Sequence, residues 1–239
     1  ACVDEVRGGV NSVKIVGWVF DRIDLSRAVE VHVYIGDECH SIMANQSYKS
    51  VDDYYGCGEY HGISVEIPTD KAGEQEVSIY AITPETGRNP KMGETKTVNI
   101  IQDHEKPVIS NITVSNVSSQ GYTITCEVTD NVGIERVQFP TWTEYGENDG
   151  QDDIIPGWQQ APEASGTING NKVSYRVNTS GHNNETGTYF THIYAYDKGN
   201  NVNVDSVKVV LNNGLTPAAV SSFNGHIYAV FNEAYSWKE

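Results

Sequence analysis

Short runs in which apolar and polar residues alternate recur along almost the whole chain. Alternation with a period of two places successive side chains on opposite faces of a β-strand. Gly, Asn, Asp and Pro interrupt these runs every eight to fifteen residues or so, a spacing typical of β-sandwiches. In the first part of the chain the pattern predicts strands at 12–21, 28–36, 62–68, 74–83 and 95–101.

The pattern restarts after a polar segment that contains Pro107. Proline cannot donate to a strand ladder and usually stands where a strand begins. Further strands are predicted at 108–117, 122–130, 134–143, 171–180, 188–197 and 204–211, with an acidic loop over 147–166. We therefore predict an all-β protein with two tandem immunoglobulin-like β-sandwiches and a short C-terminal tail. The predicted domains cover 1–103, 104–213 and 214–239.

Composition and charge narrow the function classes. Fourteen Tyr and four Trp, with abundant Val and Ile, favour packed β-structure over disorder. The formal net charge of −16 opposes binding to nucleic acid or to an anionic membrane, because both require neutralisation of phosphate. No apolar run approaches the roughly 18 residues of a membrane span. No signal peptide is recognisable at the start, so we expect an excised fragment of a secreted protein.

The chain has four cysteines, Cys2, Cys39, Cys57 and Cys126, and none of them forms a C-x-x-C pair. Their spacing gives little support to zinc or thioredoxin-like chemistry. Cys126 shares one face of a predicted strand with Ile124, so we predict a buried structural thiol. Among the other three we predict a disulfide between Cys39 and Cys57, and the pairs that involve Cys2 stay open.

Two long motifs in the second half carry a family resemblance. They read TDNVGIERVQFPTWTEYGENDGQDDIIPGWQQA and HNNETGTYFTHIYAYDKGNNV. Over residues 106–211 the chain resembles the GBS Bsp-like repeat of Gram-positive surface proteins and cell-wall hydrolases. The resemblance implies an immunoglobulin-like sandwich in an accessory, non-catalytic position of a larger secreted protein. One departure is the IIPG run before Trp158, which lengthens the usual loop.

Two weaker resemblances flank this module. Residues 3–100, with GWVFD, VHVYIG, HGISVEI and SIYAI, are similar to a GW-x-FD module of bacterial cell-wall and surface proteins. That similarity implies another all-β accessory module. The segment 223–228 and Trp237 resemble the opening strand and first helix of a C-type lectin-like domain. We therefore expect 214–239 to be the truncated start of such a domain, without its sugar site. The alternative is an amphipathic tail that docks on the sandwich.

Residue types that build hydrolytic or metal centres occur at Ser180, His182, His192, Asp152 and Asp153. His192 shares one face of a predicted strand with Phe190, Tyr194 and Tyr196, where an imidazole is more often packed than catalytic. No G-x-S-x-G, H-E-x-x-H or Gly-rich phosphate motif is present. We predict no catalytic residue, no cofactor and no enzymatic activity in this chain.

Calcium is the metal that the acidic loop suggests. Carboxylate and amide oxygens suit this ion, and the loop supplies Asn148, Asp149, Asp152 and Asp153. An EF-hand would need Glu six residues after the glycine, and Pro156 stands there. We therefore interpret the run as a solvated turn and predict no metal site, with a bound cation as the alternative.

Aromatic residues outside the predicted strands are the better functional signal. Tyrosine offers a large contact area at low entropic cost, which suits both sugar stacking and protein contacts. We predict a ligand-binding loop that contains Tyr48, Tyr54, Tyr55 and Tyr60. The alternative is that some of these rings only cover the base of the sandwich.

A rival patch lies near the acidic loop of the second domain. Its predicted ligand-binding residues are Tyr145 and Trp158. Trp142 stands close by, and its place in the resembled family indicates a partly buried ring.

We predict an extracellular, secreted or wall-attached Gram-positive protein whose modules bind a glycan or a host protein. The modules also resemble those of superantigen-like surface proteins that bind immunoglobulin variable regions, although no motif here maps that activity. Two alternatives stay open, a structural spacer and accessory modules of a cell-wall hydrolase. Nucleic acid and membrane insertion are not expected.

Overall fold

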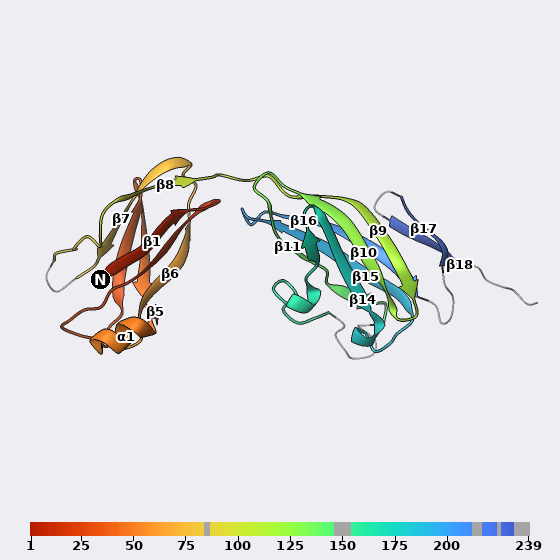
Figure 1. The fold of residues 1–239 in the computed structure, drawn as a ribbon, viewed down its shortest axis with the longest axis horizontal. Coiled ribbons are helices and arrows are strands. Elements are labelled where there is room, and N and C mark those ends of the chain that lie inside the picture. The colour runs from red at the N-terminus through yellow and green to blue at the C-terminus, as the bar shows by residue number, and fades with distance from the viewer. Residues whose placement is uncertain (84–86, 146–153, 212–216, 224–225, 232–239) are drawn as a thin grey trace, which may run out of the picture. The chain divides into compact units, whose positions relative to one another are not determined.

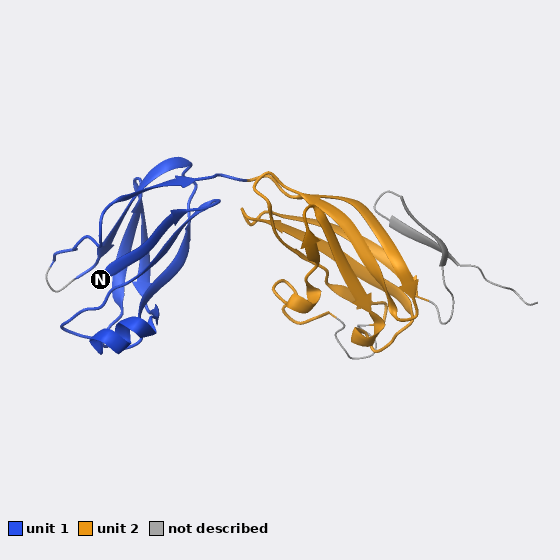
Figure 2. Cartoon of the chain, viewed as in Figure 1, with its two compact units in different colours: residues 1–103 blue, residues 104–239 orange. Residues whose placement is uncertain are grey.

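The computed structural model describes residues 1–83, 87–145, 154–211, 217–223 and 226–231. The chain divides into two compact units, unit 1 at Ala1–Asp103 and unit 2 at His104–Glu239 (Figure 2). Each unit holds two four-stranded sheets whose neighbouring strands run antiparallel (Figure 1). The all-β sandwich architecture predicted from the alternating pattern is therefore confirmed.

The first sheet of unit 1 has the strand order β1-β2-β6-β5. Its strands are β1 (Cys2–Gly8), β2 (Ser12–Trp18), β6 (Tyr60–Pro68) and β5 (Gln46–Ser47). Gly17 pairs with Val3 in this sheet, where a Cβ atom on the glycine would lie 2.4 Å from the Cys2 carbonyl oxygen. A glycine is therefore required beside Trp18, because only it admits the close approach of β1.

The second sheet of unit 1 has the order β4-β3-β7-β8. Its strands are β4 (Glu38–Ala44), β3 (Val29–Ile35), β7 (Gly73–Ala81) and β8 (Lys96–Ile100). Alternate residues of β3 and β7 face the core, among them Val31, Val33 and Ile79, as strand periodicity requires. The opposite face of the same strands carries Tyr34 and Tyr80.

A short helix, α1 (Lys49–Tyr55), follows β5 and was expected to be a loop. Val51 is its buried residue, and Gly56 ends it in the left-handed conformation while donating its N–H to the Asp52 carbonyl. The helix escaped prediction because seven residues are too few to show a helical stripe.

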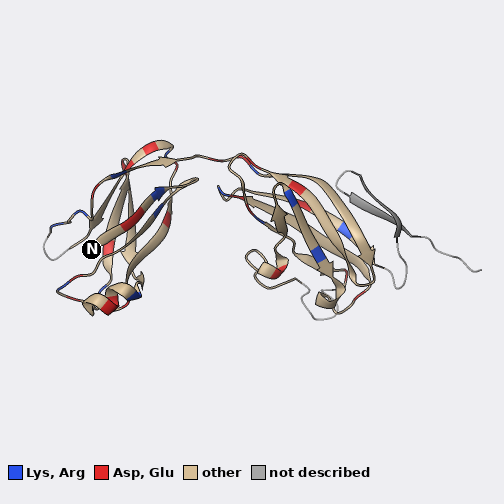
Figure 3. Cartoon of the chain, in the orientation of Figure 1, with Lys and Arg blue, Asp and Glu red and all other residues tan. Residues whose placement is uncertain are grey.

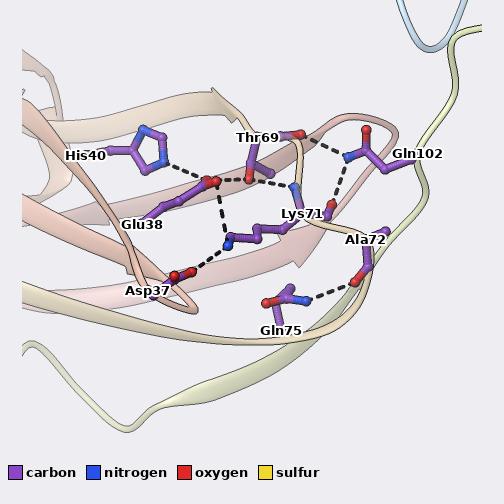
Figure 4. A network of polar contacts seen from close by, with 8 residues as sticks. All are labelled: Asp37, Glu38, His40, Thr69, Lys71, Ala72, Gln75 and Gln102. Atoms are coloured by element: carbon purple, nitrogen blue, oxygen red, sulfur yellow. Dashed lines mark hydrogen bonds and ion pairs between the residues drawn. The ribbon is translucent and has the colours of Figure 1, made fainter.

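Polar contacts close the opposite end of unit 1, where β6 ends (Figure 4). Lys71 Nζ lies 2.5 Å from Asp37 Oδ1, and this ammonium lowers the pKa of the Asp37 carboxyl. The Thr69 hydroxyl donates to Glu38 Oε2 at 2.8 Å. The Gln102 amide donates to the carbonyls of Thr69 at 2.9 Å and Lys71 at 2.7 Å. The loops at this end of unit 1 are therefore tied together by hydrogen bonds.

In unit 2 one sheet has the order β13-β14-β10-β9, and in the other β15 is flanked by β11, β12 and β16. The first comprises β13 (Thr167–Asn169), β14 (Lys172–Asn178), β10 (Gly121–Thr129) and β9 (Val108–Ser118). The second comprises β11 (Ile134–Gln138), β15 (Gly187–Asp197), β12 (Thr141–Thr143) and β16 (Val202–Leu211). Two single 3-10 turns, η1 (Pro162–Ala164) and η2 (Thr179–Gly181), lie in the connections.

The core of unit 2 contains aromatic rings. Tyr122, Phe139 and Tyr189 are fully buried, and the Tyr122 hydroxyl lies 2.8 Å from Thr191 Oγ1. Cys126 is 1% exposed, which confirms the predicted structural thiol, and burial raises the pKa of this thiol to about 11.

The disulfide predicted between Cys39 and Cys57 is not formed, since all four cysteines are free thiols. Cys39 is exposed on β4, where it pairs with Tyr34. Cys57 is buried just after α1, and its sulfur lies 4.0 Å from the Val51 carbonyl oxygen. The prediction failed because sequence spacing does not show on which element each thiol lies.

Strands β17 (Pro217–Phe223) and β18 (His226–Phe231) form an antiparallel pair. The second of them overlaps the strand predicted over 223–228, and Trp237 lies outside the described residues. The C-type lectin-like start therefore stays a prediction. No helix in the described ranges is long and apolar enough to cross a membrane.

Candidate recognition surfaces

The first candidate surface lies around α1 and the connection that follows β2. We call it the α1-end surface and define it by Phe20, Ile23, Leu25, Tyr54 and Tyr55. Ile23 is 82% exposed, Tyr54 80% and Tyr55 48%. Tyr54 and Tyr55 lie next to each other, and exposed apolar patches commonly mark interaction sites.

Ring contacts hold the α1-end surface in place. Phe20 stacks on Trp18 with centroids 5.7 Å apart, and Tyr55 lies 5.4 Å from Phe20 and 4.7 Å from Tyr54. Beneath them His61 is 3% exposed, and its Nε2 lies 3.0 Å from the Leu25 carbonyl oxygen and 2.8 Å from that of Cys57. The imidazole therefore links the connection after β2 to the end of α1.

Only two of the four tyrosines predicted here, Tyr54 and Tyr55, come together. The Tyr48 hydroxyl donates to Asp4 Oδ2 at 2.6 Å, and this carboxylate raises the pKa of the phenol. Tyr48 thus ties α1 to β1. Tyr60 is 65% exposed at the start of β6, and no ring contact joins it to the pair in the described part of the chain.

The α1-end surface is rimmed by acidic groups. Asp52 and Asp53 lie on α1, where Figure 3 shows the acidic positions next to a basic one. The basic residue, Lys49, lies 3.1 Å from Asp53 Oδ1. Asp21 pairs with Arg27 at 2.8 Å in the connection after β2. Asp53 and Asp21 are each paired with a basic side chain, so their charges are partly neutralised where they flank the surface.

The second candidate surface was not predicted from the sequence. It is a hollow of about 450 Å³ on the outer face of the sheet formed by β4, β3, β7 and β8. We call it the sheet hollow, and it is lined by His32, Tyr34, Gly36, Ser78, Tyr80, Ile82 and Asn89.

Two tyrosines and several polar groups meet in the sheet hollow. The Tyr34 and Tyr80 rings lie edge to face with centroids 5.7 Å apart. Register explains the contact, because His32 pairs with Tyr80 and Tyr34 pairs with Ser78, which makes the two rings diagonal neighbours. Aromatic faces, a hydroxyl, an imidazole and an amide are thus combined in one open concavity. Strand pairing creates it, so the linear sequence gives no local signal.

Of the rival patch of unit 2, Trp158 belongs to a row of rings on the outer face of β15. The prediction that His192 shares a face with Phe190 and Tyr194 is confirmed by the buried residues between them. Trp142 stacks on Phe190 at 5.8 Å and meets His192 edge-on at 4.8 Å. Trp158 lies over Tyr194 at 4.5 Å. The members of the row are half-buried against one another.

The other predicted residues of unit 2 do not add to this row. Tyr145 is 46% exposed, and one of its ring carbons lies close to Gly187 at the start of β15. His182 is 8% exposed and meets the Tyr189 ring edge-on at 5.4 Å, in keeping with a packed side chain. The acidic run Asn148–Asp153, with Asp152 and Asp153, lies outside the described residues.

The fold defines a class of protein, namely a pair of immunoglobulin-like or fibronectin-like β-sandwich modules. Residues 111–210 match the family model of the GBS Bsp-like repeat. This match supports the module predicted over 106–211. The match lies within unit 2, and the GW-x-FD module stays a prediction for unit 1. A search of curated proteins gives no match.

One solved structure supports the same fold, and two others are similar at lower scores. The chain is similar to the FN1–FN3 domains of chicken CNTN1, at 12% identity and a TM-score of 0.52, over 89% of this chain and 68% of that one. A marsupial T cell receptor matches at 10% identity and a TM-score of 0.30, over 92% and 74% of the two chains. The Yersinia pseudotuberculosis adhesin InvE matches at 12% identity and a TM-score of 0.28, over 92% and 65%.

Proposed function

We propose that the two units are non-catalytic recognition modules of a secreted or wall-attached Gram-positive surface protein, and that unit 1 binds a glycan in the sheet hollow. The surface-protein context is supported by the repeat family of unit 2. A glycan is proposed as the ligand because Tyr34 and Tyr80 lie beside polar groups in one concavity of about 450 Å³.

A sugar ring needs both kinds of group. Its C–H face stacks on an aromatic ring, while its hydroxyls exchange hydrogen bonds with side chains that fix its orientation. In the sheet hollow the aromatic rings come from Tyr34 and Tyr80, and the hydrogen-bonding groups come from His32, Ser78 and Asn89. The chain's charge of −16 opposes polyanionic sugars, so a neutral glycan is the expected ligand.

A glycan array probed with the full chain tests this proposal. The variants Tyr34→Ala and Tyr80→Ala should lose at least about tenfold in affinity for the neutral glycans that the wild type binds, as expected for aromatic contact residues. Both side chains point away from the core, so both variants should keep the wild-type melting temperature within a few degrees. The matched control is Tyr54→Ala with Tyr55→Ala, which should bind as the wild type does. Retained binding in the hollow variants would refute the proposed site.

A second candidate function is recognition of a host protein at the α1-end surface. The exposed aliphatic side chains of Ile23 and Leu25 favour it, because a protein partner can bury them whereas a sugar gains little from them. Immunoglobulin variable regions are one such partner class. A serum pull-down tests it: capture should fall with Ile23→Asp and Tyr54→Ala and persist with Tyr34→Ala.

The two experiments also separate the remaining alternatives. If neither glycan nor serum protein binds, the modules act as a spacer or as accessory modules of a hydrolase. If both bind, and each variant pair affects only its own ligand, unit 1 carries two independent surfaces.

A further inference from the structure

Two acidic residues of unit 2 lie close together although they follow strands of different sheets. Asp130 follows β10 in the segment TDNVG, and Asp197 ends β15 in the segment YDKGN. One carboxylate oxygen of Asp130 and one of Asp197 lie within 4.8 Å of each other. Because β10 and β15 belong to different sheets of the sandwich, the fold itself creates this approach.

Each carboxylate uses one oxygen to hold its own loop. Asp130 Oδ1 accepts the N–H groups of Val132 at 2.8 Å and Gly133 at 3.0 Å. Asp197 Oδ1 accepts the N–H of Asn201 at 2.9 Å. These bonds fix the orientation of both carboxylates, and the Lys198 N–H ties the two loops together through the Gly133 carbonyl at 3.0 Å.

The second oxygen of each carboxylate is buried without a partner. Oδ2 of Asp130 and Oδ2 of Asp197 both lack a hydrogen-bond donor, and Asp197 is 1% exposed. None of the ion pairs in the described part of the chain includes either residue, although the Lys198 side chain lies along Gly133. Two carboxylates this close, each with one oxygen buried away from water, repel each other while both are ionised, and a bound cation would offset that repulsion.

We propose that Asp130 and Asp197 bind a hard divalent cation, with calcium as the best fit. Calcium bonds to oxygen at 2.3–2.6 Å, so two oxygens on one ion can lie up to about 5.2 Å apart. The separation within 4.8 Å meets this condition. The donors are carboxylate oxygens only, the type that calcium prefers over imidazole or thiolate. Asp130 is half-buried, which leaves a side through which water can complete the coordination shell.

This site differs from the acidic run over 148–153, and it departs from the expectation that the chain holds no metal. The signal in the sequence is the pair of loops with Asp followed by Gly, and each alone resembles an ordinary turn. The proposed cation site lies in unit 2 and does not depend on the ligand proposed for unit 1.

The test is thermal unfolding of the full chain, first stripped with chelator and then supplied with calcium. When free calcium exceeds its dissociation constant by about 100-fold, the transition of unit 2 should rise by roughly 5–10 °C. Isothermal titration with calcium chloride should give one site per chain. Magnesium should give a smaller shift, because it gives up its bound water reluctantly.

Asp130→Asn and Asp197→Asn are the decisive variants. Asparagine keeps Oδ1 as an acceptor for the loop amides and removes the charge, so both variants should fold. In chelator they should melt at or above the wild-type midpoint, because the repulsion is relieved, and in calcium they should melt below the calcium-bound wild type. If these residues had only a structural role, the variants would melt below the wild type both in chelator and in calcium.

The control variant is Asp152→Asn with Asp153→Asn, which should retain the full calcium shift. A wild-type midpoint that is the same in calcium and in chelator, with no heat of binding, would overturn the proposal. A calcium shift that survives in Asp130→Asn and Asp197→Asn but disappears in the control would overturn it as well, by placing the ion in the acidic run.

Discussion

Unit 1 and unit 2 share one architecture and place their aromatic residues differently. The core cluster described for unit 1 is aliphatic apart from Met92. Phe20, Tyr54 and Tyr55 lie in the α1-end surface, and Tyr34 and Tyr80 lie in the sheet hollow. Unit 2 buries Tyr122, Phe139 and Tyr189 in its core and packs its outer rings against one another. A tyrosine-rich composition therefore says little about recognition until burial is known. The exposed rings of unit 1 do not pack in its core, so we propose that they bind the ligand.

The largest expected difference between the units concerns their core and surface rings. Phe139 is fully buried and stacks on Tyr175 with centroids 4.8 Å apart. Phe139→Ala should lower the free energy of unfolding of unit 2 by about 3–5 kcal/mol, through lost burial and a cavity. Tyr54→Ala, at a ring 80% exposed, should leave unit 1 almost unchanged. Calorimetry of the full chain measures both, and similar losses in the two variants would show that the rings of the two units do not differ in their structural role.

A smaller effect is expected from the hydroxyl groups in the core of unit 2. Tyr122→Phe removes a hydroxyl that lies 2.8 Å from Thr191 Oγ1, which also lies 2.9 Å from Thr141 Oγ1. The free energy of unfolding should fall by about 1–2 kcal/mol, the usual cost of one buried hydrogen bond and its unpaired partner. Tyr175→Phe is the matched control, because its hydroxyl donates to the Glu163 carbonyl at 2.9 Å in an exposed position. Denaturant titration should show a clearly larger loss for Tyr122→Phe.

The smallest effect concerns the buried thiol of unit 2. Burial raises the pKa of Cys126 from 9.0 to about 11, so the native state keeps this thiol neutral where the unfolded chain would ionise it. The contribution to stability is complete below pH 9 and is lost as the pH rises towards 11. Cys126→Ala should therefore show a weaker fall in stability than the wild type between pH 8 and about 10.

In unit 1 the exposed Cys39 should react with iodoacetamide under conditions that leave Cys126 unmodified.

Most of the strands could be predicted from the alternation of apolar and polar residues. The alternation in β10 placed Cys126 with Tyr122 in the core, and that in β15 placed His192 on the outer face, as observed. Strands β1 and β4 were missed because half-buried edge strands alternate weakly. A single predicted strand over 134–143 is divided into β11 and β12 around Phe139, whose N–H donates to the Ala164 carbonyl at 2.7 Å.

The candidate sites were harder to predict than the fold. Tyr54 and Tyr55 are adjacent in sequence, so their clustering was visible, whereas Tyr34 and Tyr80 meet only because β3 pairs with β7. Asp130 and Asp197 likewise meet only across two sheets. Sites that depend on long-range register leave no local pattern in a single sequence.

Glycan binding in the sheet hollow can be located by an NMR titration of the full 26.3 kDa chain with a neutral glycan selected on the array. If unit 1 binds sugar in the sheet hollow, the amide signals of 32–36 and 78–82 should shift with saturation. The signals of α1 and of β15 should stay in place. Shifts that are confined to α1 or to unit 2, with the hollow unperturbed, would show that the sheet hollow is not the glycan site.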